Sequence, residues 1–170
     1  MPQNLDELRA LAHPLRLRIL SLLTGTAMSA AEVARELGGT QANASYHLRR
    51  LHDVGLLDML DEVQVRGGWA KRYRHNPESG ERFAERNAEQ ERLLTTALTD
   101  ELRRRSEYRA SGRPSTTTDA ELWLDPQSWS EIVTKAMELS RDLHAAALPP
   151  RTPDAIKVSV TISMFSMIAD

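Results

Sequence analysis

Apolar residues recur at intervals of three and four along the first part of the chain, a spacing that predicts amphipathic helices. The pattern is interrupted at Pro14, because proline disfavours helical geometry in the residue before it but suits a first helical turn. We therefore expect one helix over residues 5–12 and a second over residues 14–23. A third is expected over residues 30–37, since Ser29 begins a Ser-x-x-Glu capping pattern there.

A fourth helix is expected over residues 41–54, after the capping residue Thr40 and before a stop at Gly55. Polar and cationic side chains cover most of its surface. Its apolar stripe is narrow and consists of Ala44, Leu48 and Leu51. A helix of this kind can pack one side on a small domain and present the other side to base edges in a DNA groove.

Two strands should follow, over residues 56–65 and 69–74, joined by a glycine-rich turn at residues 66–68. Three helices and a β-hairpin, in this order, are typical of a winged helix-turn-helix domain. We place this domain at residues 1–78 and its wing at residues 57–75.

The rest of the chain is expected to add a long helix and a small C-terminal lobe to that domain. The predicted fold class is therefore α+β and mostly α. Residues 79–110 should form a long helix, too polar for a core element, which a subunit interface would cover. Residues 111–118 have the composition of a linker. Residues 119–170 predict a strand-helix-strand lobe for dimerisation or effector binding, with strands at residues 121–124 and 156–164. The terminal strand could pair within its own subunit or across a dimer.

The net charge of −2 argues against a general nucleic-acid coat, but the charge is unevenly distributed. The segment from Asp119 onward carries a net charge of −4, which leaves +2 for the rest of the chain. Between residues 63 and 76 every charged side chain is basic. A local basic strip on a mildly acidic protein indicates that the protein binds DNA through one limited part of its surface.

Composition and motifs exclude several other functions. The chain has no cysteine, which excludes disulfides and thiolate metal sites. Its histidines are scattered, and no phosphate-binding loop, Gly-x-Ser-x-Gly or His-Glu-x-x-His motif occurs. We therefore predict no metal, no cofactor, no catalytic residue and no enzymatic activity. The absence of a signal-peptide pattern and of a long apolar run predicts a cytoplasmic protein with no membrane partner.

Side chains of the fourth helix and the wing are the candidates for DNA contact. Gln and Asn can pair with adenine, Arg with guanine or phosphate, and cationic wing residues with phosphates. The candidates are Thr40, Gln41, Asn43, Ser45, Tyr46, Arg49, Arg50, Arg66, Lys71 and Arg72. Successive strand residues face opposite sides, so Lys71 and Arg72 cannot both face DNA equally. If these side chains do not contact DNA, the helix residues belong to an ordinary solvated face, and the wing cations are edge residues of a hairpin that resist aggregation. His47 lies beside the apolar stripe and is expected to pack rather than to contact bases.

The C-terminal lobe holds a large share of the bulky side chains. They could line an effector pocket or simply form the core of the lobe. The candidates for effector binding are Trp123, Trp129, Met137 and Phe165. For the basic run at residues 103–105, interaction with the C-terminal helix dipole is a sufficient explanation.

Three motifs resemble those of the ArsR-type winged-helix transcriptional regulators. They are Leu-Ala-His-Pro-Leu-Arg-Leu-Arg-Ile-Leu at residues 11–20, Leu-Gly-x-Thr-Gln-x-x-x-Ser-x-His-Leu-x-x-Leu-x-x-x-Gly-Leu at residues 37–56, and the Arg-Gly-Gly wing followed by residues 73–77. The resemblance covers residues 5–78. It implies a homodimer, built from the first helix and a helix after the wing, that binds palindromic operators and usually represses. Metal sensors of that family use cysteines or paired histidine and carboxylate ligands, and neither set stands out in this chain.

The leading hypothesis is a dimeric, sequence-specific DNA-binding transcriptional repressor. Its expected partners are palindromic double-stranded DNA, a second copy of the chain and an unknown small-molecule effector. The alternative is a winged-helix module that binds protein through its tail, without specific DNA binding.

Overall fold

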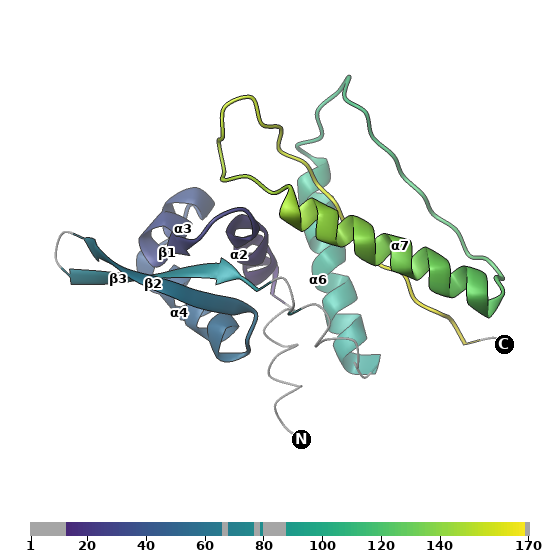
Figure 1. Ribbon diagram of the computed structural model, residues 1–170, viewed down its shortest axis with the longest axis horizontal. Coiled ribbons are helices and arrows are strands. Elements are labelled where there is room, and N and C mark those ends of the chain that lie inside the picture. The colour runs from purple at the N-terminus through teal and green to yellow at the C-terminus, as the bar shows by residue number, and fades with distance from the viewer. Residues whose placement is uncertain (1–12, 66–67, 77–78, 80–87, 169–170) are drawn as a thin grey trace.

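The computed structural model describes residues 13–65, 68–76, 79 and 88–168, and in these it has five helices and a three-stranded antiparallel sheet (Figure 1). The mixed α+β class is confirmed for this part of the chain. The helix expected at residues 5–12, the wing residues Arg66 and Gly67, and residues 80–87 of the long helix lie outside the described residues. The elements are α2 (Pro14–Thr24), β1 (Met28–Ser29), α3 (Ala30–Leu37), α4 (Gln41–Asp53), β2 (Leu57–Val65), β3 (Gly68–His75), α6 (Ala88–Ser106) and α7 (Pro126–Ala145).

Helix α3 begins and ends where its local sequence predicts. The Ser29 side chain accepts a hydrogen bond from the Glu32 amide at 3.4 Å, and the Ser29 amide donates to the Glu32 carboxylate at 2.7 Å. These two bonds form the expected capping box. Gly38 ends the helix with a φ of 72°, a left-handed conformation that favours glycine. The direction in which the chain enters α4 is therefore set by local signals.

Ser29→Ala is expected to lower the free energy of unfolding by about 1 kcal/mol, because it removes the side-chain half of this cap. Urea denaturation followed by circular dichroism would measure the loss. Ser21→Ala, on the exposed side of α2, is the matched control and should cost nothing. Equal losses in the two variants would contradict the importance of the cap.

The core lies where α2, α3 and α4 pack against the sheet. The side chains with the least exposure there are Ile19, Leu23, Val33, Leu48, Leu51 and Leu57. Helix α6 packs on α2 and adds Leu94 to the same cluster. The expectation that this helix is too polar to be a core element was therefore wrong. A single narrow stripe, with Leu94 and Ala97 buried, is enough for a helix that touches the core on one side.

The sheet has the strand order β1-β3-β2, and the predicted hairpin forms its larger part. Strand β1 was not expected. It pairs with β3 through Met28 opposite Tyr73 and Ser29 opposite Arg72. A strand of two residues shows no alternation in the sequence, so only the pairing reveals it.

Neither of the two strands expected in the C-terminal lobe forms within the described part of the single chain, so the prediction of a strand at residues 121–124 and of a terminal strand paired within its own subunit was wrong. Pairing of residues 156–164 across a dimer stays a prediction. Residues 121–124 and 156–164 join no sheet, and their side chains are exposed. The predicted helix between them is present as α7, capped by the Asp125 carboxylate, which accepts from the Ser128 amide at 2.9 Å. Helix α7 buries none of its residues. Alternation indicates a face suited to a strand, but a strand also needs a neighbouring strand.

Several described residues of the C-terminal part lie against the first domain. The backbone of Leu148 lies so close to Gly25 that a Cβ at Gly25 would stand 2.3 Å from the Leu148 carbonyl oxygen. The Arg151 guanidinium lies 3.3 Å from the Glu36 carboxylate, and the rings of His75 and His144 lie 5.5 Å apart. Within the ranges that the structure describes, no helix has the length and apolarity needed to cross a bilayer.

Candidate nucleic-acid interface

Helix α4 is held on the domain by its buried stripe. Ala44, Leu48 and Leu51 are buried, as their spacing predicts. The Thr40 hydroxyl accepts a hydrogen bond from the Asn43 amide at 3.2 Å and caps the helix. One side of α4 is thus fixed, and the other faces outward.

Most candidates on α4 lie on its exposed surface. Gln41, Asn43, Tyr46 and Arg49 are exposed, and Ser45 is half-buried. The Arg49 Nε donates to the Ser45 carbonyl at 3.3 Å, which lays the arginine along its own helix. These side chains combine amide, phenol and guanidinium groups, the types that pair with base edges and phosphates.

Arg50 is placed differently from the other candidates. It is half-buried, and its Nε is shielded from solvent without a hydrogen-bond partner among the described atoms. Its charge also lies close enough to Arg16 of α2 to contribute to the lowered pKa of Arg16, of which burial is the larger cause. The structure therefore turns Arg50 toward α2, on the flank of the exposed surface.

A buried pair, Arg16 and His47, connects α2 to α4. The Arg16 Nε donates to the His47 Nδ1 at 3.1 Å, which requires that nitrogen to be unprotonated. Burial, followed by the positive charge of Arg16, lowers the pKa of His47. His47 therefore packs inside, as its position predicts. Arg16 was not among the predicted residues, although it shares the helical spacing of buried Ile19 and Leu20 and so marks a cation on an apolar face.

The wing shows which strand face continues the surface of α4. Tyr73 is buried, and its ring lies 5.7 Å from the ring of His52 on α4. Burial raises the pKa of Tyr73. By alternation, Lys71 and Trp69 share this face nearer the tip, and both are exposed. Trp69, 67% exposed, is a candidate contact that was not among the predicted site residues.

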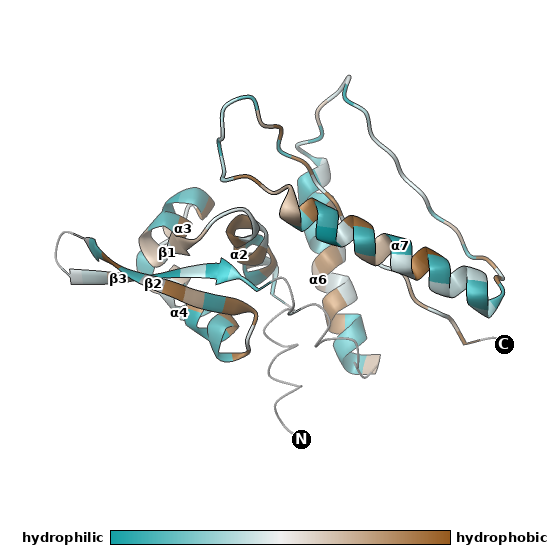
Figure 2. Ribbon diagram, viewed as in Figure 1, coloured by the Kyte–Doolittle hydropathy of each residue, from teal (hydrophilic) through white to brown (hydrophobic). Residues whose placement is uncertain are grey.

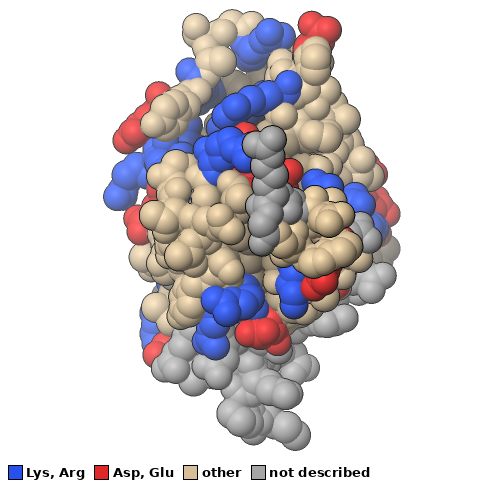
Figure 3. Space-filling view, turned by 90° about the vertical axis from the view of Figure 1, so that its left-hand side faces the viewer, with Lys and Arg blue, Asp and Glu red and all other residues tan. Residues whose placement is uncertain are grey.

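The second cation predicted in the wing is engaged within the protein. Arg72 is half-buried, donates a hydrogen bond to the Ala27 carbonyl and lies 3.8 Å from the Glu32 carboxylate. Among the described residues, the ion pair of Lys71 is an exposed contact with Glu62 at 3.9 Å. Of these two cations, Lys71 is the freer one. Figure 3 looks onto this end of the molecule and shows Lys and Arg atoms in several groups across the face, with acidic atoms interspersed.

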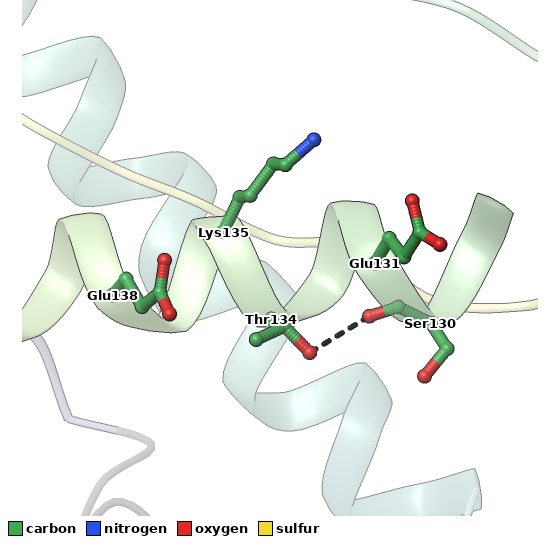
Figure 4. Close-up of a pocket in the computed structure, with 5 residues that line it drawn as sticks. All are labelled: Ser130, Glu131, Thr134, Lys135 and Glu138. Carbon is green, nitrogen blue, oxygen red and sulfur yellow. Dashed lines mark hydrogen bonds between the residues drawn. The ribbon is translucent and has the colours of Figure 1, made fainter. Parts of the chain in front are cut away.

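Three of the four effector candidates have exposed side chains, and none of the four lines the hollow described below. Trp123 is 90% exposed, Phe165 and Met137 are also exposed, and Trp129 is half-buried. The alternative prediction, that these side chains form the core of the lobe, was wrong for the single chain, because none of the four is buried. A shallow hollow is present on α7, but it is lined by other side chains of that one helix (Figure 4), namely Ser130, Glu131, Thr134, Lys135 and Glu138. Thr134 donates to the Ser130 carbonyl, an ordinary bond within the helix. In the described ranges no cluster of three potential metal ligands occurs.

Two comparisons with known proteins bear on this site. Residues 11–59 match the family model of a helix-turn-helix domain. The chain is also 41% identical, over 58 residues, to the HTH-type transcriptional regulator YgaV of Escherichia coli (strain K12). That alignment covers 34% of this chain and 59% of the relative, which is less than two thirds of its length. The matched segment contains α2, β1, α3 and α4. The N-terminal part of this chain therefore carries a helix-turn-helix domain.

Proposed function

We propose that the protein is a dimeric, sequence-specific DNA-binding repressor of the ArsR type. The observation that carries this proposal is the surface of α4. Its buried stripe fixes one side, and the other presents Gln41, Asn43 and Arg49 to solvent. The similarity of part of the chain to a transcriptional regulator supports the same function.

In the proposed complex the first turns of α4 enter the major groove, and the wing contacts flanking phosphates. A twofold dimer places its two α4 helices in successive major grooves, about 34–36 Å apart, on a palindromic operator. Lys71 and Trp69 lie on the wing face that continues from α4, so they would reach the flanking DNA. A small-molecule effector acting on this dimer is part of the proposal.

The second candidate is a module that binds protein. Exposed apolar side chains on the wing, Trp69 with Met59 and Val63, favour it. A module of this kind would show no salt-sensitive, competitor-resistant binding to fragments of its own promoter region. Fluorescence anisotropy titrations of the full chain with such fragments separate the two functions.

Arg49→Ala is expected to weaken operator binding by about 1 kcal/mol, or about fivefold, and to reduce the salt slope by about one. The reason is the loss of an exposed guanidinium from the middle of α4. Anisotropy at several salt concentrations would measure both quantities.

Arg141→Ala is the matched control, because this arginine is exposed on α7 and not on α4. It should leave both the affinity and the salt slope unchanged. Unchanged values for Arg49→Ala as well would remove Arg49 from the interface.

A further inference from the structure

The C-terminal segment of residues 156–164 carries an apolar face that the other described residues leave partly exposed. Every second side chain is apolar, and these side chains remain 40–64% exposed. They are Ile156, Val158, Val160, Ile162 and Met164. Figure 2 shows further brown positions alternating with teal along α7, which also buries no residue. Apolar surface of this extent on a single chain is typical of an interface.

The backbone of the segment has one edge in use and one edge open. Arg105 of α6 donates to the Val160 carbonyl and to the Thr161 hydroxyl, each at 3.3 Å. Among the described residues, no backbone-to-backbone hydrogen bond involves residues 156–164. In an extended chain the polar groups of successive residues point to opposite edges. The edge of the even-numbered residues therefore faces Arg105, and the edge of the odd-numbered residues is open.

We propose that residues 156–164 pair antiparallel with the same residues of a second copy of the chain, about a twofold axis at Val160. The inference rests on the homodimer of the proposed function and locates one of its interfaces. In this register Ile156 lies opposite Met164, and Val158 lies opposite Ile162. One face of the ribbon is then apolar throughout, as paired strands require.

The other face of the ribbon is also compatible with self-pairing. Lys157 is the only charged residue in residues 155–169. It lies opposite Ser163 of the other copy, so no like charges meet. Ser159 lies opposite Thr161, which gives a polar pair. A segment with one charge away from its centre is therefore complementary to itself, as an isologous interface requires.

The bond from Arg105 also sets the type of pairing at the axis. Because the Val160 carbonyl is turned toward Arg105, the two Val160 residues form a non-hydrogen-bonded pair. Ser159 and Thr161 then exchange backbone hydrogen bonds between the copies. A two-stranded ribbon is marginal alone. Each copy brings an α7 with exposed Ile132 and Met137, which would pack on the apolar face.

Single cysteines test this register cleanly, because the natural chain has none. In a non-hydrogen-bonded pair the two Cα atoms lie about 4.5 Å apart, within the range of a disulfide. V160C should therefore form a covalent dimer under mild oxidation. The matched control V158C places its two thiols four residues out of register, about 13 Å apart. On a non-reducing gel, V160C is expected to cross-link at least about tenfold faster than V158C.

Sedimentation of the unmodified chain at micromolar concentration completes the test. A dimer whose V160C variant cross-links no faster than V158C would overturn this inference and leave the homodimer standing. A monomer would overturn both. Circular dichroism of the two reduced variants checks that they fold alike, and DNA binding, measured separately, remains an independent test of the proposed function.

Discussion

Leu48→Ala is expected to lower the free energy of unfolding by about 3 kcal/mol, the largest effect of a single substitution considered for this chain. Leu48 has 0% exposure and lies in the middle of the stripe that joins α4 to the core. Truncation removes its apolar contacts and leaves a cavity between α4 and its neighbours. Urea denaturation followed by circular dichroism at pH 7 measures the loss.

Gln41→Ala is the matched control on the same helix. Gln41 is exposed in the first turn, so this variant should change the stability by about 0.5 kcal/mol or less. It should instead weaken operator binding, because a glutamine can pair with adenine. A loss of less than about 1 kcal/mol for Leu48→Ala would contradict the role of Leu48 in fixing α4.

The stability of the protein is expected to fall by about 2 kcal/mol between pH 7 and pH 5 because of His75 alone. Burial, followed by the nearby charge of His144, lowers the pKa of His75 from 6.5 to about 4, against the opposing effect of Asp58. The neutral ring lies 3.2 Å from the Thr24 hydroxyl and 3.4 Å from the Ser79 hydroxyl. Below pH 6.5 His75 becomes protonated in the unfolded chain, whereas in the folded chain it stays neutral until about pH 4. Unfolding is therefore favoured as the pH falls through this window.

The measurement is the difference in unfolding free energy between pH 7 and pH 5 for the natural chain and for His75→Gln. In His75→Gln the decrease in unfolding free energy between pH 7 and pH 5 should be smaller by about 2 kcal/mol than in the natural chain, whatever the stability of the variant at pH 7. His144→Gln should retain most of the difference, because burial is the larger cause of the lowered pKa. Equal pH dependence in the natural chain and His75→Gln would contradict the assignment.

The part of the fold that follows from local signals could be predicted from the sequence. Pro14, the Ser29–Glu32 box and Gly38 define helix ends through contacts within a few residues. Strand β1 and the contribution of α6 to the core could not be predicted, because both depend on contacts with distant segments. The terminal strand was predicted from the alternation of residues 156–164, which reports a face and not the strand that must lie beside it.

The candidate site shows the same limit. Helical spacing correctly separated the buried Leu48 and Leu51 from exposed Arg49. It could not show that Arg72 donates to the Ala27 carbonyl, 45 residues away. The bond from Arg16 to His47 spans 31 residues and was missed for the same reason. Spacing identifies faces of one element, whereas a partner on another element is fixed only by the tertiary fold.

Gly25 lies at the contact between the helix-turn-helix domain and the C-terminal part of the chain. Its φ of −84° is one that any residue adopts, so the turn after α2 has no need of glycine. The need comes from Leu148, whose carbonyl oxygen occupies the space of a Cβ. Because glycine has no Cβ, the backbone of Leu148 can pack directly against residue 25. The position of α7 is therefore encoded partly by a glycine of the helix-turn-helix domain.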